Sequence, residues 1–141
     1  MIRFGILGAG RIAHSFAKAM DVTSGKIAGV ASRDLSRAQV FQGEYGIEKA
    51  YGSYQAMFED PTIDVIYVAT PHGLHYSQML EALDYNKALL TEKAFTLNAK
   101  EAKEVFEKAK AKNVFVMEAM WTRFLPITQT LFNRVEAGII G

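Results

Sequence analysis

The chain contains no cysteine among its 141 residues. Disulfides, thiol nucleophiles and cysteine-ligated metal sites are therefore excluded, and the absence suits a reducing cytoplasm. The chain also has no marked excess of charge, because 16 Lys and Arg side chains face 15 Asp and Glu, which gives a formal net charge of +1. A balance this even leaves no electrostatic footprint for nucleic acid or for an anionic membrane surface.

Long apolar runs are missing as well. No segment approaches the roughly 20 apolar residues that are needed to span a bilayer. The N-terminal stretch MIRFGILGAGRIAHSF has only a short apolar run, and Arg11 and His14 follow it in place of the small-residue cleavage site of a secretory signal. We therefore expect a soluble, cytoplasmic protein with no membrane partner and no metal site.

What the chain does contain is a regular alternation of two kinds of segment. Runs typical of strands occur at Ile2–Leu7, Ile27–Ser32, Val65–Thr70, Ala88–Thr91 and Val114–Glu118, with a further short one at Lys49–Tyr51. Helical spacing occurs at Arg11–Met20, Leu35–Tyr45, Tyr54–Phe58, His75–Asn86, Asn98–Lys112 and Pro126–Ala137. Several strands, such as VIYVA, are apolar without alternation, which is typical of parallel strands covered on both faces. The order predicts an α/β fold, a doubly wound and mostly parallel sheet of about six strands flanked by helices.

The first expected strand runs into a glycine-rich turn, G-x-G-x-x-A, formed by Gly8, Gly10 and Ala13. Gly8 allows a tight turn, Gly10 lets a pyrophosphate approach the backbone, and Ala13 keeps the helix close to the strand. The helix start supplies free N–H groups and a partial positive charge. At the first βα turn of such a chain the motif predicts a bound dinucleotide; the alternative is a tight turn without a ligand.

The second expected strand ends in AGVASRD. An NAD-binding domain usually has an acidic side chain there, which holds the ribose diol. This chain offers Ser32 and Arg33, with Asp34 one position late and Arg37 one turn into the next helix. A hydroxyl with a guanidinium suits a 2′-phosphate, which arginine binds through two parallel hydrogen bonds. The sequence therefore favours NADP(H) over NAD(H). In the alternative, Arg33 is an exposed loop residue and Asp34 or Ser36 caps the helix.

Polar side chains also follow the later strands, where a parallel sheet binds its ligands. Because carbonyl chemistry needs a proton donor or acceptor near the hydride site, we expect Glu92 and Lys93 to be catalytic. Taken singly, each of these residues would be an ordinary loop or core residue, and only their shared location marks them. The candidates are Thr70, Pro71, His72 and His75 after one strand, Glu92 and Lys93 after the next, and Trp121 and Arg123 after the last.

Five blocks of the sequence together resemble the glucose-fructose oxidoreductase / inositol dehydrogenase (Gfo/Idh/MocA) family: GILGAGRIA, ASRD, VATPHGLHYSQMLEAL, LLTEKAFTLNAKEA and VMEAMWTRFLP. The likeness runs along the whole chain. The last block and the Ser-Arg pair look most like the NADP-dependent dihydrodiol dehydrogenase and D-xylose dehydrogenase branch. The resemblance implies an NADP(H)-dependent oxidoreductase with a Rossmann domain, which moves a hydride between nicotinamide and a sugar, polyol or diol.

The resemblance also assigns roles to single residues. Lys93 matches the catalytic lysine of the family's E-K-P motif, beside Glu92. Residues implied to line the cofactor are Gly8, Gly10, Arg11 and Ile12 at the pyrophosphate, Ser32, Arg33 and Arg37 at the 2′-phosphate, and Thr70, Pro71, His72, His75, Glu92 and Lys93 at the ribose and nicotinamide. Trp121 and Arg123 would face the substrate.

Two features depart from the family pattern. Ala94 stands where the family usually has proline, and alanine regains an N–H and is expected in a trans peptide bond, so Lys93 would be aimed less rigidly. Family members also continue into a substrate domain that commonly forms a homo-oligomer interface. We therefore expect residues 1–121 to form the dinucleotide-binding domain, residues 122–141 to begin the connection to a domain absent here, and this chain alone to be inactive. The competing hypothesis is a non-catalytic dinucleotide-binding or redox-sensing module.

Overall fold

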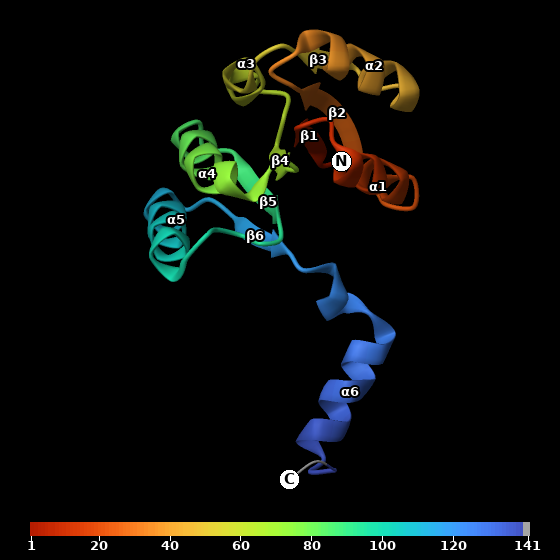
Figure 1. Ribbon diagram of the computed structural model, residues 1–141, viewed down its shortest axis with the longest axis vertical. Coiled ribbons are helices and arrows are strands. Elements are labelled where there is room, and N and C mark those ends of the chain that lie inside the picture. Colours follow the sequence, from red (N-terminus) through yellow and green to blue (C-terminus); the bar gives the residue numbers. More distant parts are fainter. Residues whose placement is uncertain (140–141) are drawn as a thin grey trace.

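The computed structural model describes residues 1–139, and strands and helices alternate along them (Figure 1). The strands are β1 (Arg3–Leu7), β2 (Lys26–Ala31), β3 (Lys49–Tyr51), β4 (Val65–Val68), β5 (Ala88–Glu92) and β6 (Val116–Ala119). The helices are α1 (Arg11–Met20), α2 (Leu35–Tyr45), α3 (Tyr54–Glu59), α4 (His75–Asp84), α5 (Ala99–Lys112) and α6 (Pro126–Glu136). Two short 3₁₀ turns, His72–Leu74 and Trp121–Phe124, were not expected from the sequence.

The six strands form one parallel sheet in the order β3-β2-β1-β4-β5-β6. The predicted doubly wound α/β fold is therefore confirmed, with every pairing parallel. The strand order reverses between β1 and β4, and in such sheets the ligand crevice opens beyond the carboxyl ends of the strands at that point. The turns after β1, β2, β4 and β5 all lie at this carboxyl edge.

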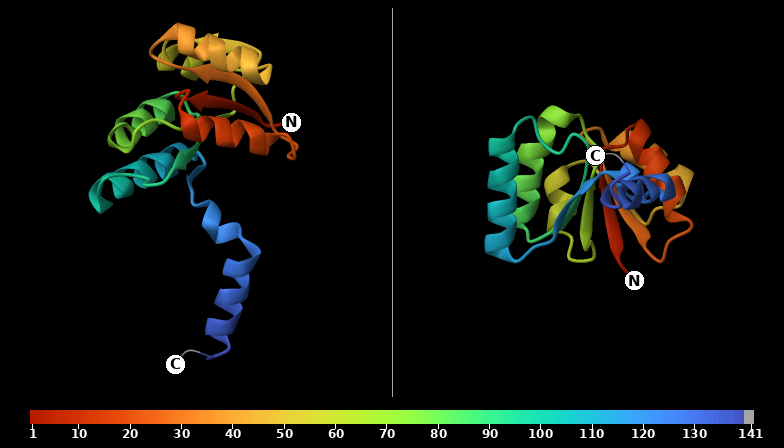
Figure 2. Two further views of the ribbon diagram at one scale, coloured as in Figure 1. Left: turned by 45° about the vertical axis from the view of Figure 1, so that its right-hand side comes forward. Right: turned by 90° about the horizontal axis from the view of Figure 1, so that it is seen from below.

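Two apolar clusters, one on each face, hold the sheet and helices together. Helices α1 and α2 pack around Ile6 and Val30 on one face, and α3, α4 and α5 pack around Leu7, Ile66 and Leu89 on the other. Figure 2 shows α4 and α5 on one side of the sheet and α1 on the opposite side. Neighbouring residues of a strand point to opposite faces, so a strand covered on both faces, such as β1 with Ile6 and Leu7 fully buried, is continuously apolar.

Helix α6 extends away from the sheet (Figures 1 and 2). None of its residues is buried, and its apolar side chains Ile127, Leu131 and Phe132 are more than half exposed. The chain leaves the sheet directly after β6, close to the boundary expected near residue 121, while the role of residues 122–141 as a connection stays a prediction. Within residues 1–139, no helix combines the length and the apolarity that crossing a membrane requires.

Candidate functional site

The glycine-rich turn between β1 and α1 needs its first glycine for steric reasons. Gly8 has a φ of +99°, and its N–H donates to the backbone oxygen of Ala31 at 2.9 Å. A Cβ on Gly8 would lie 3.1 Å from the Ala69 oxygen and 3.0 Å from Thr70 Cγ2. Only glycine adopts this conformation readily, so Gly8 lets the turn pack against the end of β4.

The second glycine of the turn has no such constraint. Gly10 has an ordinary φ of −97°, and a Cβ there would meet only the Ala69 oxygen, 4.0 Å away. The missing side chain therefore keeps a space open instead of relieving a clash. Helix α1 begins at Arg11 without a side-chain cap or an acidic residue in its first turn, so its first N–H groups remain available to an anion. These features fit the pyrophosphate of a dinucleotide.

A cleft of about 290 Å³ connects this turn with two other loops at the carboxyl edge. It brings together most of the residues that the sequence assigned to the nucleotide, because the ends of β1, β2 and β4 are neighbours in the sheet. The cleft is lined by Gly8, Ala9, Gly10, Ser32, Arg33, Asp34, Arg37, Tyr54, Ala69, Thr70 and Pro71. Tyr54 was not among the expected site residues, since in the sequence it resembles any aromatic residue at the start of a helix.

The turn after β2 determines which side chains can meet the adenosine ribose. The Asp34 carboxylate caps α2 and accepts hydrogen bonds from Ser36 Oγ at 2.7 Å and Ser36 N at 2.9 Å. These bonds hold the pKa of Asp34 below its usual value, and both of them engage the same carboxylate oxygen, Oδ1. Ser32 is nearly buried and accepts from the Asp34 N–H, whereas Arg33 and Arg37 are exposed at the cleft.

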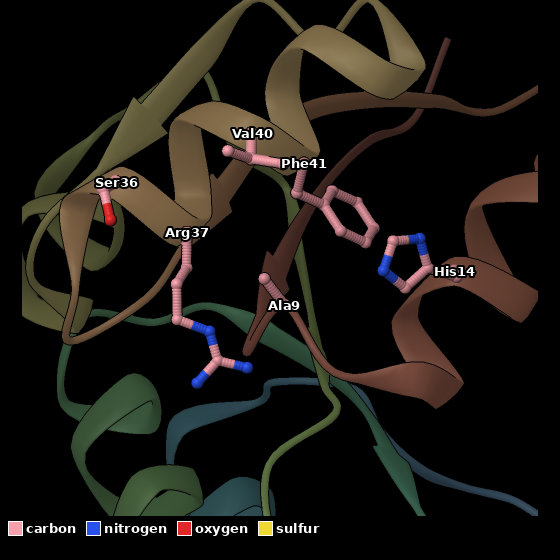
Figure 3. Close-up of a pocket in the computed structure, with 6 residues that line it drawn as sticks. All are labelled: Ala9, His14, Ser36, Arg37, Val40 and Phe41. Carbon is pink, nitrogen blue, oxygen red and sulfur yellow. The ribbon is translucent and has the colours of Figure 1, made fainter.

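Arg37 also borders a second hollow, of about 200 Å³, between α1 and α2. In Figure 3 its side chain extends from α2 alongside the turn that carries Ala9, and His14 packs its ring against Phe41. The ring centroids of His14 and Phe41 are 4.6 Å apart. Arg37 therefore lines both hollows.

At the end of β5, Glu92 and Lys93 lie in different surroundings. Glu92 is nearly buried, and its carboxyl group accepts a hydrogen bond of 2.6 Å from the Tyr67 hydroxyl on β4. Burial, together with this bond to Glu92, raises the pKa of Tyr67, so the phenol keeps its proton and remains the donor. Lys93 is exposed, and within residues 1–139 its amine has no hydrogen-bond or ion-pair partner. The lysine is thus presented at the carboxyl edge beside a fixed acid.

The segment after Lys93 differs from expectation. The Lys93–Ala94 peptide bond is cis, so the expected trans bond is wrong. Hydrogen bonds on both sides set the chain direction here: Tyr67 binds Glu92, and the Phe95 N–H donates to Glu118 Oε1 at 3.1 Å. These contacts involve other strands, so the intrinsic preference of alanine does not decide the conformation.

Of the expected histidines and the expected residues after β6, the structure brings only some to the site. His72 is exposed, with its ring centroid 5.5 Å from that of His75, but His75 is fully buried and its ring faces backbone oxygens instead of the cleft. Trp121 and Glu92 both line an apolar hollow of about 500 Å³. Arg123 lines a different hollow, near Glu118. The structure thus brings Trp121, but not Arg123, together with Glu92.

The Gfo/Idh/MocA family model, described as "Oxidoreductase family, NAD-binding Rossmann fold", matches residues 2–120. Among curated proteins, the chain is 40% identical over 143 residues to trans-1,2-dihydrobenzene-1,2-diol dehydrogenase of Mus musculus, covering 99% of this chain and 43% of the relative. It is 38% identical over 154 residues to D-xylose 1-dehydrogenase (NADP(+)) of Hypocrea jecorina, covering 99% of this chain and 39% of that relative. The chain thus spans less than half the length of these curated relatives.

Solved structures give the same result. KijD10, a 3-ketoreductase from Actinomadura kijaniata in complex with TDP-benzene and NADP, superposes with a TM-score of 0.92 at 27% identity, over 99% of this chain and 45% of that one. An NAD binding oxidoreductase from Klebsiella pneumoniae superposes with a TM-score of 0.88 at 25% identity, over 99% and 40%. With the phosphate turn, the parallel sheet and the family match in agreement, this chain belongs to the Gfo/Idh/MocA oxidoreductase family and forms its NAD(P)-binding Rossmann fold.

Proposed function

We propose that this chain is the NADP(H)-binding domain of an oxidoreductase that moves a hydride between nicotinamide and the CH–OH carbon of a diol, sugar or polyol. The observation that carries the proposal is the convergence of the phosphate turn, the Ser32–Arg33 turn and Lys93 at one edge of the sheet. The cofactor, when bound, supplies the hydride acceptor or donor. The chain's own residues hold the cofactor and handle the proton.

The preference for NADP(H) is supported by the turn after β2. One oxygen of Asp34, Oδ1, is engaged as a helix cap, which reduces what this carboxylate offers to a ribose diol. Arg33 and Arg37 are exposed beside Ser32 and can bind a 2′-phosphate through charge-assisted hydrogen bonds. Two of the similar proteins carry NADP in their names, the xylose dehydrogenase and the ketoreductase complex. We therefore propose Ser32, Arg33 and Arg37 at the 2′-phosphate, and Gly8 and Gly10 with the first N–H groups of α1, those of Arg11 and Ile12, at the pyrophosphate. The side chain of Ile12 lines the hollow that Glu92 and Trp121 also line.

We assign the proton transfer to and from the substrate hydroxyl to Lys93. In the oxidation direction bound NADP⁺ would supply the hydride acceptor, and the Lys93 amine would accept the hydroxyl proton of the substrate. Glu92, held by Tyr67, fixes the strand end that carries the lysine. Thr70, Pro71 and His72 lie at the neighbouring strand end, on the ribose and nicotinamide side.

The substrate and the remaining partners are proposed here for the full-length protein. The similar proteins are named for a dihydrodiol and for D-xylose, so we propose a small diol or sugar, with Trp121 facing it and a further domain supplying the other contacts. That domain would also carry a homo-oligomer interface. Arg123, expected from the sequence to face the substrate too, lines a separate hollow near Glu118. A cytoplasmic location remains a prediction from the sequence.

An activity assay of the full-length protein tests the proposal. Purified enzyme is incubated with NADP⁺ and, in separate reactions, trans-dihydrodiols, D-xylose and other sugars and polyols, and NADPH formation is followed by its absorbance. We expect turnover with at least one diol or sugar, and faster turnover with NADP⁺ than with NAD⁺. NADP⁺ binding without turnover on any CH–OH substrate would instead support a non-catalytic dinucleotide-binding module.

A further inference from the structure

His75 connects two loops of the site without entering the cleft. It opens α4, its side chain is fully buried, and both ring nitrogens lie at hydrogen-bond distance from backbone oxygens. Nε2 is 2.9 Å from the oxygen of Thr70, and Nδ1 is 3.0 Å from the oxygen of Ala94. Thr70 lies in the loop after β4 that lines the nucleotide cleft, and Ala94 directly follows Lys93.

The chemistry of the ring makes these two contacts directional. Both partners are carbonyl oxygens, which only accept, so each contact requires an N–H on the ring. The imidazolium form donates to both oxygens, and either neutral tautomer donates to one. A single rigid ring therefore spans two loops that are separated by more than twenty positions in the sequence.

A second residue of α4, Gln78, also contacts Thr70. Gln78 lies one turn after His75, is buried, and accepts a hydrogen bond from the Thr70 hydroxyl. Thr70 is thus held through its backbone oxygen and through its side chain, while it still lines the nucleotide cleft. A shift of this loop on cofactor binding would therefore be transmitted to α4.

The segment around Lys93 is held at both ends and free in the middle. Tyr67 binds Glu92 before the lysine, and His75 binds the Ala94 oxygen after it. Lys93 itself is exposed. Because a misplacement of about 1 Å in a catalytic group can cost on the order of 10²-fold in rate, the contacts of its two neighbours determine how well the amine is aimed.

We propose that His75 is a positioning residue that couples the nucleotide loop, through Thr70, to the lysine loop, through Ala94. The inference deepens the proposed function and rests on it, since it takes Lys93 as the proton-transfer group. It differs from the sequence-based expectation that His75 borders the cofactor. In the structure His75 acts on the site only through backbone oxygens.

Two polar variants separate the two contacts. In His75→Asn the amide nitrogen lies near the position of Nδ1 and keeps a donor for the Ala94 oxygen, whereas in His75→Gln it lies near Nε2 and keeps the donor for Thr70. In the full-length protein we expect His75→Gln to lower kcat on the order of 10²-fold, with the KM for NADP⁺ little changed. We expect His75→Asn to retain kcat within a fewfold. Equal losses in both variants, with equal losses of thermal stability, would assign His75 a purely structural role and overturn the proposal.

A second readout does not depend on turnover. Two-dimensional NMR of the 141-residue chain follows the amides of Thr70 and Phe95 as NADP⁺ is added. In the wild type both amides should shift. In His75→Asn both should still shift, because Gln78 keeps Thr70 linked to α4 and the new amide keeps the Ala94 contact. In His75→Gln the shift of Thr70 should remain while that of Phe95 is lost. A Phe95 shift as large in His75→Gln as in the wild type would contradict the coupling. If Lys93→Met retained full turnover while the NMR pattern held, the catalytic assignment would fail and the coupling would stand.

Discussion

Replacing Lys93 by methionine in the full-length protein is expected to lower kcat by about 10²- to 10⁴-fold, the usual contribution of a positioned acid–base group. The methionine side chain has a similar length but no titratable amine, so the change removes the proton-transfer group and keeps most of the side-chain volume. Lys93 is exposed, and no described residue pairs with its amine, so folding should be unaffected. The measurement is steady-state kinetics at saturating NADP⁺, together with the Kd of NADPH from fluorescence titration, which should change little.

A matched lysine controls for the loss of charge. Lys100 lies on α5, where its side chain is 86% exposed and its amine is 4.0 Å from Glu104. Exposed pairs of this kind contribute little to stability. Lys100→Met should therefore leave kcat and the Kd of NADPH within about twofold of the wild-type values. A Lys93→Met enzyme that matched the Lys100→Met enzyme in kcat would remove Lys93 from the mechanism.

The second large effect concerns the phosphate turn. Gly10→Val is expected to weaken NADP⁺ binding on the order of 100-fold, because the new side chain would fill the cleft and cost about two hydrogen bonds to a charged group, roughly 3 kcal/mol in all. The fold should survive, since Gly10 has an ordinary φ and a Cβ there meets no protein atom closer than 4.0 Å. Loss of the glycine cap would cost at most about 1 kcal/mol. Calorimetric titration gives the affinity, and thermal unfolding of the same sample gives the stability.

Two other glycines provide the controls. Gly43 is exposed on α2 with open space around it, so Gly43→Val should leave NADP⁺ affinity unchanged. Gly8→Val should lower both affinity and stability, because Gly8 has a positive φ and its Cβ would lie 3.1 Å from the Ala69 oxygen. If Gly10→Val bound NADP⁺ as tightly as Gly43→Val, the cleft beside Gly10 would not be the pyrophosphate site.

Most of the fold could be predicted from the sequence, because local signals determine it. Apolar runs without alternation indicated buried parallel strands, and the observed elements agree with the expected ones to within one or two residues at most ends. The glycine spacing of the first turn was equally informative, since Gly8 and Gly10 occupy positions with distinct steric demands. Signals of this kind depend only on residues close together in the chain.

The internal contacts of the site could not be predicted, because they depend on which strands become neighbours. Tyr67 belongs to the apolar run VIYVA, and its bond to Glu92 exists because β4 lies beside β5. His75 carried no signal that its ring would bind two backbone oxygens. The cis bond before Ala94 was likewise missed, because the intrinsic preference of alanine predicts a trans bond and carries no information on contacts with other elements.

The turn after β2 has features of both sequence-based interpretations. Asp34 caps α2 and Arg33 is exposed, as the interpretation without a 2′-phosphate expected. The same arrangement leaves two guanidinium groups beside Ser32 and engages Asp34 Oδ1 in the cap. The geometry therefore fits both an exposed loop without a ligand and a 2′-phosphate site. A comparison of NADP⁺ and NAD⁺ affinity distinguishes the two interpretations.

The most direct test of the central claim is a calorimetric titration of the 141-residue chain with NADP⁺ and, separately, with NAD⁺. We predict that NADP⁺ binds more tightly by about 10- to 150-fold, the equivalent of one hydrogen-bonded charge contact of about 1.5–3 kcal/mol. Arg33→Ala should remove most of that difference while leaving NAD⁺ affinity unchanged. NAD⁺ binding as tight as or tighter than that of NADP⁺ would contradict the account.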